Sequence, residues 1–564
     1  MMTCSATPRH SAGEAGSVEE MNAFGRRKGR GLLLSGLSAA ATLCAAGLAL
    51  ADPALGLNPE RMAGAPSPEA SGLAEPKLDL VTSSASDPPP VAYDPTAGPM
   101  LSPTQGALQA AMERLVTRGD RHNPLGSGNW RAGRGAIAAF YAGRSYEPLW
   151  VTEDGLTKAG QGVLAQLKRA PDDGLNLFGS ALPGDLKPGL DPNAIAEAET
   201  AIASAIVIYA GQATGSRVPP LRVSPLIFAK PSVIDPGTAL VETAMAADPA
   251  KRLADFNPPQ KGYRDLRDEL NRLDTAGVAP RRPLAVSADL DPDPLFELQD
   301  EGSSRRIRRA LNPHIYRAST SPTATGASTR RRAAILANME MWRWEPRDMG
   351  ERRIEVNLAD FSLAVMEGDR VIHQARVIVG KPETPTPIFS DVMRYVLINP
   401  SWRVPDSIIK KEMMAKLGSL SRRGYEVKTI GGRLTVRQLP GEDNALGRFA
   451  FMFPNDHAIY LHDTPSKELF NEETRAFSHG CIRVEDPQSL AVLVLGGESA
   501  HWTDERIEAA IGGKERTVFL ARPLPIHIEY FTDFVDEFGE LQERPDVYGL
   551  IRKVEGILAH EGQD

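Results

Sequence analysis

The spacing of hydrophobic residues changes part-way along this chain, and that change sets the fold class. Between Leu108 and about Leu284, apolar residues recur every three or four positions, for example at Ile202 and Ile206. This spacing is typical of the buried face of a helix. From Ile354 onward, apolar and polar residues alternate, as in strands with one buried face. We therefore expect a multidomain α+β protein with a mainly helical domain followed by a β-rich domain.

The chain has 564 residues, too many for one hydrophobic core. Stretches rich in Pro, Ala, Ser and Gly without apolar periodicity predict linkers. The expected segments are a signal peptide (1–51), a disordered linker (52–105), a helical domain (106–285), a second linker (286–330), a β-rich domain (331–530) and a C-terminal extension (531–564).

One insertion interrupts the β-rich domain. Residues 400–440 include a helical-looking piece over 406–417 followed by a loop. Long insertions of this kind often cover a functional site, so we expect a lid here. A short helix is predicted over 333–342, and strands over 354–358, 361–365, 371–379, 395–398 and 458–461.

The N-terminal region has the pattern of an export signal. Basic residues from Arg26 to Arg30 precede an apolar run, Gly31–Leu50, which ends in Ala49-Leu50-Ala51. A positive region, an apolar region and an A-x-A site predict secretion with cleavage. The expected location is the periplasm or cell envelope, with membrane attachment only through an uncleaved signal.

Charge and cysteine content exclude several classes of protein. The net charge is -8, and no region is basic enough to indicate nucleic acid as the main partner. Three cysteines are too few for a disulfide framework. Cleavage after Ala51 would remove Cys4 and Cys44 and leave Cys481. A lone thiol in an oxidising compartment is either buried and inert or kept for chemistry.

Cys481 lies between candidate partners. A free cysteine with a pKa of about 8.5 is only a few per cent thiolate at pH 7, so a nucleophilic role needs a base. His462 closes an apolar strand and is the better candidate; His479 is two residues from the thiol. The amides of Gly480 and Cys481 are candidates for an oxyanion hole. Arg483 is placed to orient an anionic group or to brace the loop.

Two other interpretations of these residues stay open. His457, His462, His479 and Cys481 are all possible metal ligands, but their spacing matches no zinc signature. An inert buried thiol is the other alternative. The residues favour a cysteine acyl-transfer site without naming its substrate.

The stretch Ser478–Arg483 with its upstream histidine resembles the catalytic signature of the L,D-transpeptidases. The resemblance covers roughly residues 135–285 and 330–530, and the earlier part is similar to the helical scaffold domain of the large periplasmic branch. Further stretches that carry it are Arg144–Leu175, Thr384–Pro387, Phe389, Asn399–Pro400, Trp402, Val404–Pro405, Asn444–Gly447, Phe453–Asn455, His462–Lys467 and Phe470.

The resemblance implies a β-sandwich-like catalytic domain with a helical capping insertion at about 408–437. It implies that Cys481 attacks the carbonyl of the third residue of a peptidoglycan stem peptide and releases D-alanine. The thioester would then pass to an amine of a neighbouring acceptor stem and form a 3→3 crosslink. His462 would be the base, and Ser478, His479, Gly480 and Arg483 would line the site. No metal or cofactor is implied.

The sequence departs from this branch of the family in one respect. Many members carry a small peptidoglycan-binding module between the two domains, whereas residues 286–330 are short and lack its hydrophobic pattern. The module is expected to be missing or degenerate. Three functions remain alternatives: an L,D-carboxypeptidase, an enzyme that attaches proteins to the wall, and a non-catalytic wall-binding scaffold.

Overall fold

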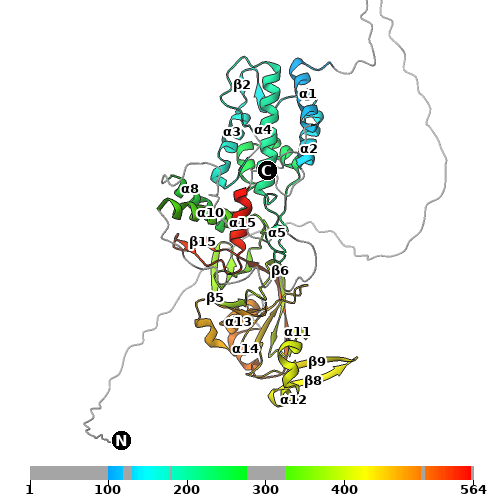
Figure 1. The fold of residues 1–564 in the computed structure, drawn as a ribbon, viewed down its shortest axis with the longest axis vertical. Coiled ribbons are helices and arrows are strands. Elements are labelled where there is room, and N and C mark those ends of the chain that lie inside the picture. Colours follow the sequence, from blue (N-terminus) through cyan, green and yellow to red (C-terminus); the bar gives the residue numbers. More distant parts are fainter. Residues whose placement is uncertain (1–99, 118–129, 178–180, 276–323, 497–501, 561–564) are drawn as a thin grey trace, which may run out of the picture. The chain divides into compact units, whose positions relative to one another are not determined.

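The computed structural model describes residues 100–117, 130–177, 181–275, 324–496 and 502–560 (Figure 1). The predicted signal peptide lies outside these ranges. So do most of the predicted linker at 52–105 and residues 286–323, where the degenerate module was expected. Those expectations remain predictions.

The N-terminal described part is helical, as predicted. Its elements are α1 (Pro103–Thr117), α2 (Trp130–Gly143), β1 (Val151–Thr152), β2 (Gly155–Leu156), α3 (Lys158–Lys168), η1 (Ala170–Asp173), α4 (Pro192–Ala213), α5 (Pro220–Val223), α6 (Pro236–Met245), α7 (Pro249–Ala254) and α8 (Lys261–Thr275).

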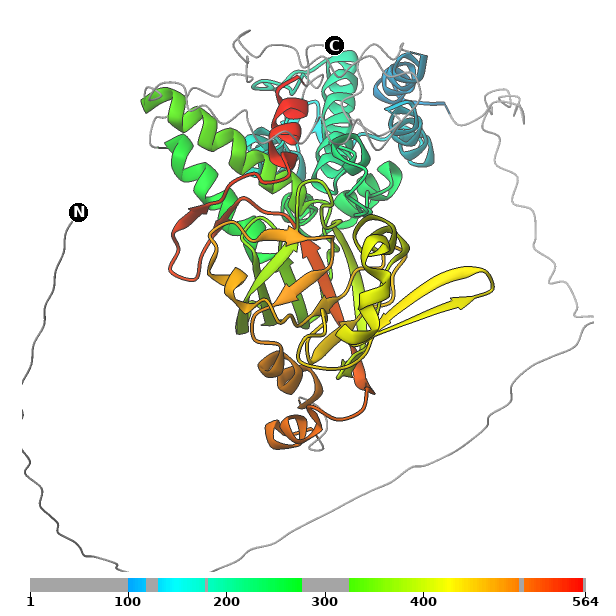
Figure 2. The ribbon, with the colours of Figure 1, turned by 60° about the horizontal axis from the view of Figure 1, so that its bottom comes forward.

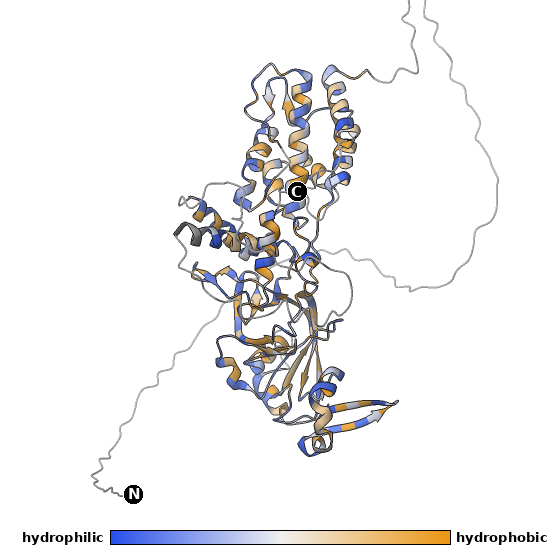
Figure 3. Cartoon of the chain, in the orientation of Figure 1, coloured by the Kyte–Doolittle hydropathy of each residue, from blue (hydrophilic) through white to orange (hydrophobic). Residues whose placement is uncertain are grey.

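The helix α4 is the centre of this domain. It packs against α1, α2, α3 and α6, and Figure 1 shows it alongside α1 and α2. Ile195, Ile202 and Ile206 are buried, which confirms the predicted apolar face. Among the described residues α4 is the one helix long and apolar enough to cross a membrane, and 72% of its most apolar window is buried in the domain. Its orange, hydrophobic residues in Figure 3 therefore belong to the core of the helical domain.

The first helix begins inside the predicted linker. The Gln105 N–H donates to Ser102 Oγ at 3.2 Å, and the Ser102 N–H donates to Gln105 Oε1 at 2.8 Å. This reciprocal pair is a capping box, with Pro103 at the first helical position. The composition of the preceding stretch hid this start signal.

The helix α10 (Ala324–Trp342) also begins inside a predicted linker. It starts nine residues before the predicted helix at 333–342, since the segment before residue 333, which contains Ser, Thr and Gly, is also helical. These residues have weak intrinsic helix propensity. The contacts of α10 with α8 and α15 (Leu550–His560) stabilise the helix as a whole.

The second half is a nine-stranded sheet, which confirms the predicted β-rich domain. The strand order is β12-β5-β13-β11-β10-β6-β14-β3-β4, and β4 also pairs with β5. The sheet therefore closes on itself. The strands are β3 (Arg352–Asn357), β4 (Ser362–Glu367), β5 (Arg370–Gly380), β6 (Phe389–Ile398), β10 (Phe449–Met452), β11 (Leu461–His462), β12 (Ala476–Ser478), β13 (Ile482–Val484) and β14 (Arg516–Glu529).

One predicted strand is shorter than expected. Instead of running over 458–461, the strand β11 begins at Leu461, because Ala458 has a φ of 54° in the left-handed region. The side chain of Asn455 accepts hydrogen bonds from the N–H groups of His457 and Ile459. Such side-chain bonds hold a turn in place of a strand.

A small insertion separates β6 from β10. It consists of β7 (Trp402–Arg403), α11 (Asp406–Ile408), the π-helix η4 (Ile409–Met413), η5 (Met414–Lys416), α12 (Leu417–Leu420), η6 (Ser421–Arg423), β8 (Tyr425–Ile430) and β9 (Arg433–Gln438). Val404, Ile409, Leu420 and Val436 form its own small core. The hairpin of β8 and β9, yellow in Figure 2, extends from this capping insertion.

The C-terminal segment is part of the main core. Between β13 and β14 lie helices α13 (Pro487–Gly496) and α14 (Asp504–Ala510). After β14, the last strand of the sheet, come β15 (Asp533–Val535), β16 (Leu541–Glu543) and α15. Val554 of α15 is fully buried in the same apolar cluster as the strands of the sheet.

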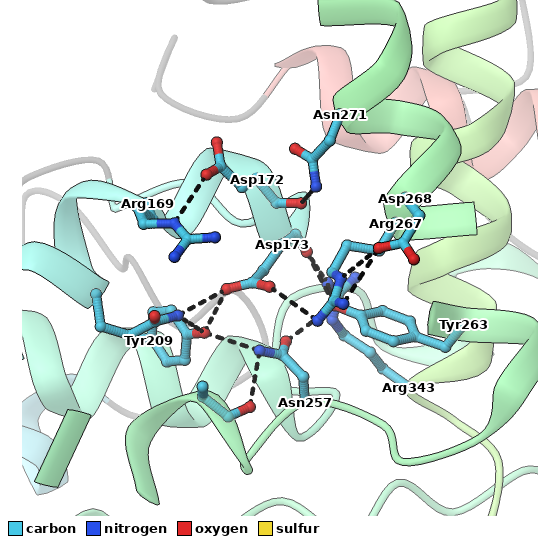
Figure 4. A network of polar contacts seen from close by, with 12 residues as sticks. Arg169, Asp172, Asp173, Tyr209, Asn257, Tyr263, Arg267, Asp268, Asn271 and Arg343 are labelled. Atoms are coloured by element: carbon cyan, nitrogen blue, oxygen red, sulfur yellow. Dashed lines mark hydrogen bonds and ion pairs between the residues drawn. The ribbon is translucent and has the colours of Figure 1, made fainter. Parts of the chain in front are cut away.

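A buried polar network joins the helical domain to the segment after α10 (Figure 4). The Tyr209 hydroxyl donates to Asp173 Oδ2 at 2.6 Å. The Tyr263 hydroxyl and Arg343 Nη2 donate to the Asp173 carbonyl oxygen at 3.0 and 2.7 Å. Burial raises the pKa of the Asp173 carboxyl, although the hydrogen bond from Tyr209 and the positive charges of Arg267 and Arg343 act in the opposite direction. Because lost partners inside such a network leave buried polar groups unpaired, it fixes how the two parts pack.

Candidate active site

Two neighbouring parallel strands, β11 and β13, carry the predicted site residues His462 and Arg483. The strand β11 pairs with β13, so that Leu461 lies opposite Ile482 and His462 lies opposite Arg483. Successive side chains of a strand point to opposite faces. Leu461 and Ile482 are fully buried in the apolar core, and therefore His462 and Arg483 share the other face.

Cys481 directly precedes β13 and extends its pairing with the β11 segment by one residue. The Ile482 N–H donates to the Tyr460 carbonyl oxygen at 3.2 Å, which places Cys481 beside Tyr460. The Tyr460 side chain hydrogen-bonds the Cys481 thiol. The sulfur, the imidazole of His462 and the guanidinium of Arg483 thus belong to one face of two adjacent strands.

The hydrogen bonding of His462 defines its tautomer. Its Nδ1 lies 2.5 Å from the Asp463 carbonyl oxygen, and since a carbonyl oxygen only accepts, Nδ1 carries the hydrogen. Nε2 is then the basic nitrogen. Burial, together with the positive charge of Arg483, lowers the pKa of His462 to about 4. The imidazole is therefore neutral at pH 7.

The thiol of Cys481 is also neutral at rest. Cys481 is half-buried, and burial raises the pKa of the thiol to about 11, although hydrogen bonds from Tyr460 and the charge of Arg483 act in the opposite direction. The thiol donates to the Ala458 carbonyl oxygen at 3.6 Å. In the resting state the Cys481 thiol therefore keeps its proton and the His462 imidazole is neutral.

The loop before the cysteine is held by its own side chain. Ser478 Oγ donates to the Cys481 carbonyl oxygen at 2.5 Å and accepts from the Gly480 N–H at 3.0 Å. Gly480 has a φ of 121°, a conformation that favours glycine. The predicted oxyanion hole of two amides therefore needs correction, because the Gly480 N–H is already bonded to Ser478. The Cys481 N–H remains the candidate donor.

Two residues that sequence reasoning missed support this loop from behind. Thr386 Oγ1 donates to the Gly480 carbonyl oxygen at 2.7 Å and accepts from the Gly380 N–H at 2.9 Å. Tyr548 Oη donates to the Gly380 carbonyl oxygen at 2.5 Å. Thr386 stands within the motif Thr384–Pro387, whereas Tyr548 lies in the C-terminal segment, where no local pattern marks it.

Comparison with known proteins identifies both parts of the chain. Residues 351–504 match the family of L,D-transpeptidase catalytic domains, and residues 135–270 match the family of Scaffold domains. The chain carries an L,D-transpeptidase catalytic domain. All of the site residues described in this subsection, except Tyr548, lie inside the match to the catalytic-domain family, 351–504.

A curated relative and several solved structures are similar to parts of this chain. A Haemophilus influenzae protein named "Putative L,D-transpeptidase" is 31% identical over 223 residues, which are 36% of this chain and 45% of the relative. The chain thus spans about half the length of this curated relative.

The solved structures are more distant. An L,D-transpeptidase from Mycobacterium smegmatis has 13% identity and a TM-score of 0.19, over 32% of this chain and 58% of that one. A cysteine-to-serine mutant of the Enterococcus faecium L,D-transpeptidase has 12% identity and a TM-score of 0.16, over 40% and 82%. At these scores the likeness supports no further conclusion.

His479 links the loop that precedes Cys481 to the capping insertion of the L,D-transpeptidase domain. Its Nε2 lies 3.0 Å from Glu412 Oε1, which belongs to η4. Both side chains are about half exposed, at 44% and 51%. His479 therefore contacts the cap, and His462 is the histidine that shares a face with the thiol.

The possible metal ligands do not converge in this L,D-transpeptidase domain. The ring of His457 packs against the rings of Phe228 and Phe389, while His479 contacts Glu412. Within the described ranges, no group of three or more His, Cys, Asp or Glu side chains is arranged to hold a metal ion.

Proposed function

We propose that this chain is a peptidoglycan L,D-transpeptidase that forms 3→3 crosslinks in the cell envelope. The observation that carries the proposal is the arrangement of Cys481 and His462. A thiol and a neutral imidazole with a fixed tautomer lie on one face of adjacent strands, as nucleophilic catalysis by a thiol requires.

The acylation step follows from the protonation states. His462 Nε2 takes the thiol proton as Sγ attacks the carbonyl of stem residue 3 in the donor tetrapeptide. The tetrahedral intermediate then collapses, and the bond between this carbonyl carbon and the nitrogen of D-alanine breaks. The imidazolium returns its proton to the departing amine. The products are a thioester on Cys481 and free D-alanine.

The second step reverses these roles. The side-chain amine of a neighbouring stem attacks the thioester and gives a proton to His462. The C–S bond breaks, and the thiolate regains a proton from the imidazolium. An amide between two third residues is left, which is the 3→3 crosslink.

The surroundings of the Arg483 side chain support an anionic substrate. Its Nε is buried and has no hydrogen-bond partner among the described residues. A buried guanidinium N–H without an acceptor is costly, although the charge of Glu468 also acts on Arg483. Stem peptides carry carboxylates that could accept from this N–H. We assign Arg483 the role of orienting one of these carboxylates beside Cys481, with the Cys481 N–H facing the developing oxyanion.

Incubation of the full chain with disaccharide-tetrapeptide tests this function. Crosslinked dimers with release of D-alanine are expected, and Cys481→Ala should give none. Tripeptide monomers without dimers would instead indicate an L,D-carboxypeptidase that uses the same acyl-enzyme. Unchanged substrate with a folded protein would overturn the enzymatic assignment in favour of a wall-binding scaffold.

A further inference from the structure

The helical domain contributes an exposed aromatic side chain to the catalytic domain. The ring of Phe228 lies on the ring of His457, with 3.9 Å between centroids and 36° between planes. Phe389 contacts the same imidazole edge-on, at 4.8 Å and 61°. Phe228 is nevertheless 41% exposed. The two rings in contact, those of Phe228 and His457, are called the aromatic shelf below.

Backbone pairing fixes Phe228 in this position. Ile227 and Ile388 form an isolated parallel bridge. The Phe228 N–H donates to the Ile388 carbonyl oxygen at 2.9 Å, and the Ile388 N–H donates to the Leu226 carbonyl oxygen at 2.8 Å. Phe228 is therefore held by two main-chain bonds and a buried isoleucine, although it comes from the Scaffold part of the sequence, 135–270.

The aromatic shelf lies next to the nucleophile. His457 directly precedes Ala458, whose carbonyl oxygen accepts the hydrogen bond of the Cys481 thiol at 3.6 Å. Asn455 Oδ1 accepts from the His457 N–H at 2.9 Å, which holds this turn. Since neighbouring Cα atoms are about 3.8 Å apart, the backbone of His457 lies within one or two residues' length of the sulfur.

A shelf of this kind suits a ligand with a flat apolar face. Aromatic rings bury a large apolar area and retain specific stacking geometry, and a pyranose ring presents C–H groups on one face. In the donor, the sugar is separated from the carbonyl of stem residue 3 by about three residues. An extended chain of that length spans roughly 10 Å, which is compatible with a thiol at one end and the shelf at the other.

We propose that the aromatic shelf is a saccharide subsite that binds a pyranose ring of the donor glycan. The inference rests on the proposed function, since it names part of the substrate of that same site. It gives the helical domain a direct role in substrate selection. Phe228 acts as a specificity residue that distinguishes glycan-linked stems from free peptides.

The test compares two donors, disaccharide-tetrapeptide and the free tetrapeptide, on the full chain. Phe228→Ala should raise KM for the disaccharide donor by about fivefold to tenfold, which is the effect of losing one aromatic contact. Its kcat, and both constants for the free tetrapeptide, should stay unchanged. Phe228→Trp should restore the low KM. Phe538, which is 81% exposed in the C-terminal segment, provides the matched control Phe538→Ala.

A purely structural role for Phe228 gives a different pattern. It would change the constants for both donors alike, and that result would overturn the inference, as would no change with either donor.

A measurement of donor binding without catalysis tests the saccharide subsite independently of the proposed function. Calorimetry on Cys481→Ala with the disaccharide-tetrapeptide should give at least fivefold weaker binding when Phe228→Ala is added. Failure of the wild type to form an acyl-enzyme would overturn the proposed function, whereas this binding experiment would still decide the subsite. Equal binding by the two proteins, or no binding by Cys481→Ala, would overturn the subsite.

Discussion

His462 lies directly opposite Arg483 in the parallel pairing of β11 with β13. A guanidinium next to a buried imidazole disfavours the protonated form of that imidazole. The pairing thus keeps His462 ready to accept a proton, and it places a cation where the donor's carboxylates would need one. Cys481, one register step earlier, lies on the same face of the two strands.

Replacing Arg483 by glutamine should therefore change the titration of His462. The pKa of His462, lowered to about 4 by burial and by this charge, should rise. The acid limb of the acylation-rate profile should move to higher pH by the same amount, and KM for the donor should increase. Imidazole titration by NMR and the pH dependence of acylation measure these effects. Lys553→Gln, at an exposed site on α15, is the control, and an unmoved acid limb in Arg483→Gln would contradict the coupling.

Removal of the base should change the shape of the pH profile. With His462 present, acylation should fall as pH drops toward about 4 and stay level through neutral pH, since the imidazole is already deprotonated there. His462→Ala should be about 10²- to 10⁴-fold slower at pH 7. Its rate should then rise tenfold per pH unit toward the thiol pKa of about 11. A level profile in His462→Ala would mean that another group takes the proton.

Two buried carboxyls, Glu345 and Glu529, and the partly buried Glu355 predict a pH dependence of stability. Burial and the nearby carboxylates raise the pKa of Glu345 to about 8 and also raise that of Glu529, while burial raises that of Glu355 despite the charge of Arg353. Because the pKa values of these carboxyls are raised in the folded protein, the folded state binds more protons than the unfolded state. The stabilising effect of this proton binding is full below about pH 4.5 and is lost as pH rises through about 8.

Glu529→Gln should reduce this pH dependence. The fall in Tm between pH 5 and pH 8 should be smaller in the variant than in the wild type, because one of the interacting carboxyls no longer ionises. Thermal unfolding at both pH values measures the difference. Glu537→Gln, at an exposed position, should behave as the wild type. An equal fall in Tm for Glu529→Gln would refute the role of the cluster.

The contact between His479 and Glu412 should restrain the capping insertion. An exposed contact between a histidine and a carboxylate contributes no more than an exposed ion pair, about 0–1 kcal/mol, so Glu412→Gln should increase the rate of Cys481 alkylation by at most about fivefold. Iodoacetamide modification followed by mass spectrometry gives this rate. Glu426→Gln, which removes a cap residue paired with Lys428, controls for changes within the cap. If both variants react at the wild-type rate, the contact does not restrain access.

A carbapenem should acylate Cys481, because its strained lactam carbonyl is a good acceptor for an activated thiol. The expected result is a mass increase equal to the whole inhibitor, located on the peptide that contains Cys481. The same increase in Cys481→Ser would contradict the assignment of the thiol as the nucleophile.

Sequence patterns predicted those parts of the fold and site that depend on local order. The alternation around Ile354 and the helical spacing of α4 were sufficient for the two domain types. Cys481 and His462 could be selected because each is marked by its immediate neighbours. The capping box at Ser102 is also a local sequence pattern, but it was not predicted, because the Pro-, Ala-, Ser- and Gly-rich composition before it indicated a linker.

Long-range contacts could not be predicted in this way. Tyr548 contacts Gly380 across 168 positions of sequence, and Phe228 reaches His457 from the other domain. Nothing local distinguishes either from an ordinary aromatic core residue. The Gly480 N–H was misassigned because a neighbouring serine side chain competes for backbone donors, which depends on the conformation of the loop.

The most direct test of the account is intact-mass spectrometry of the protein after brief incubation with a tetrapeptide stem. The account predicts a transient adduct equal to the donor minus D-alanine, located on Cys481 and absent from Cys481→Ala. A folded protein with a free, titratable thiol that forms no such adduct would contradict it.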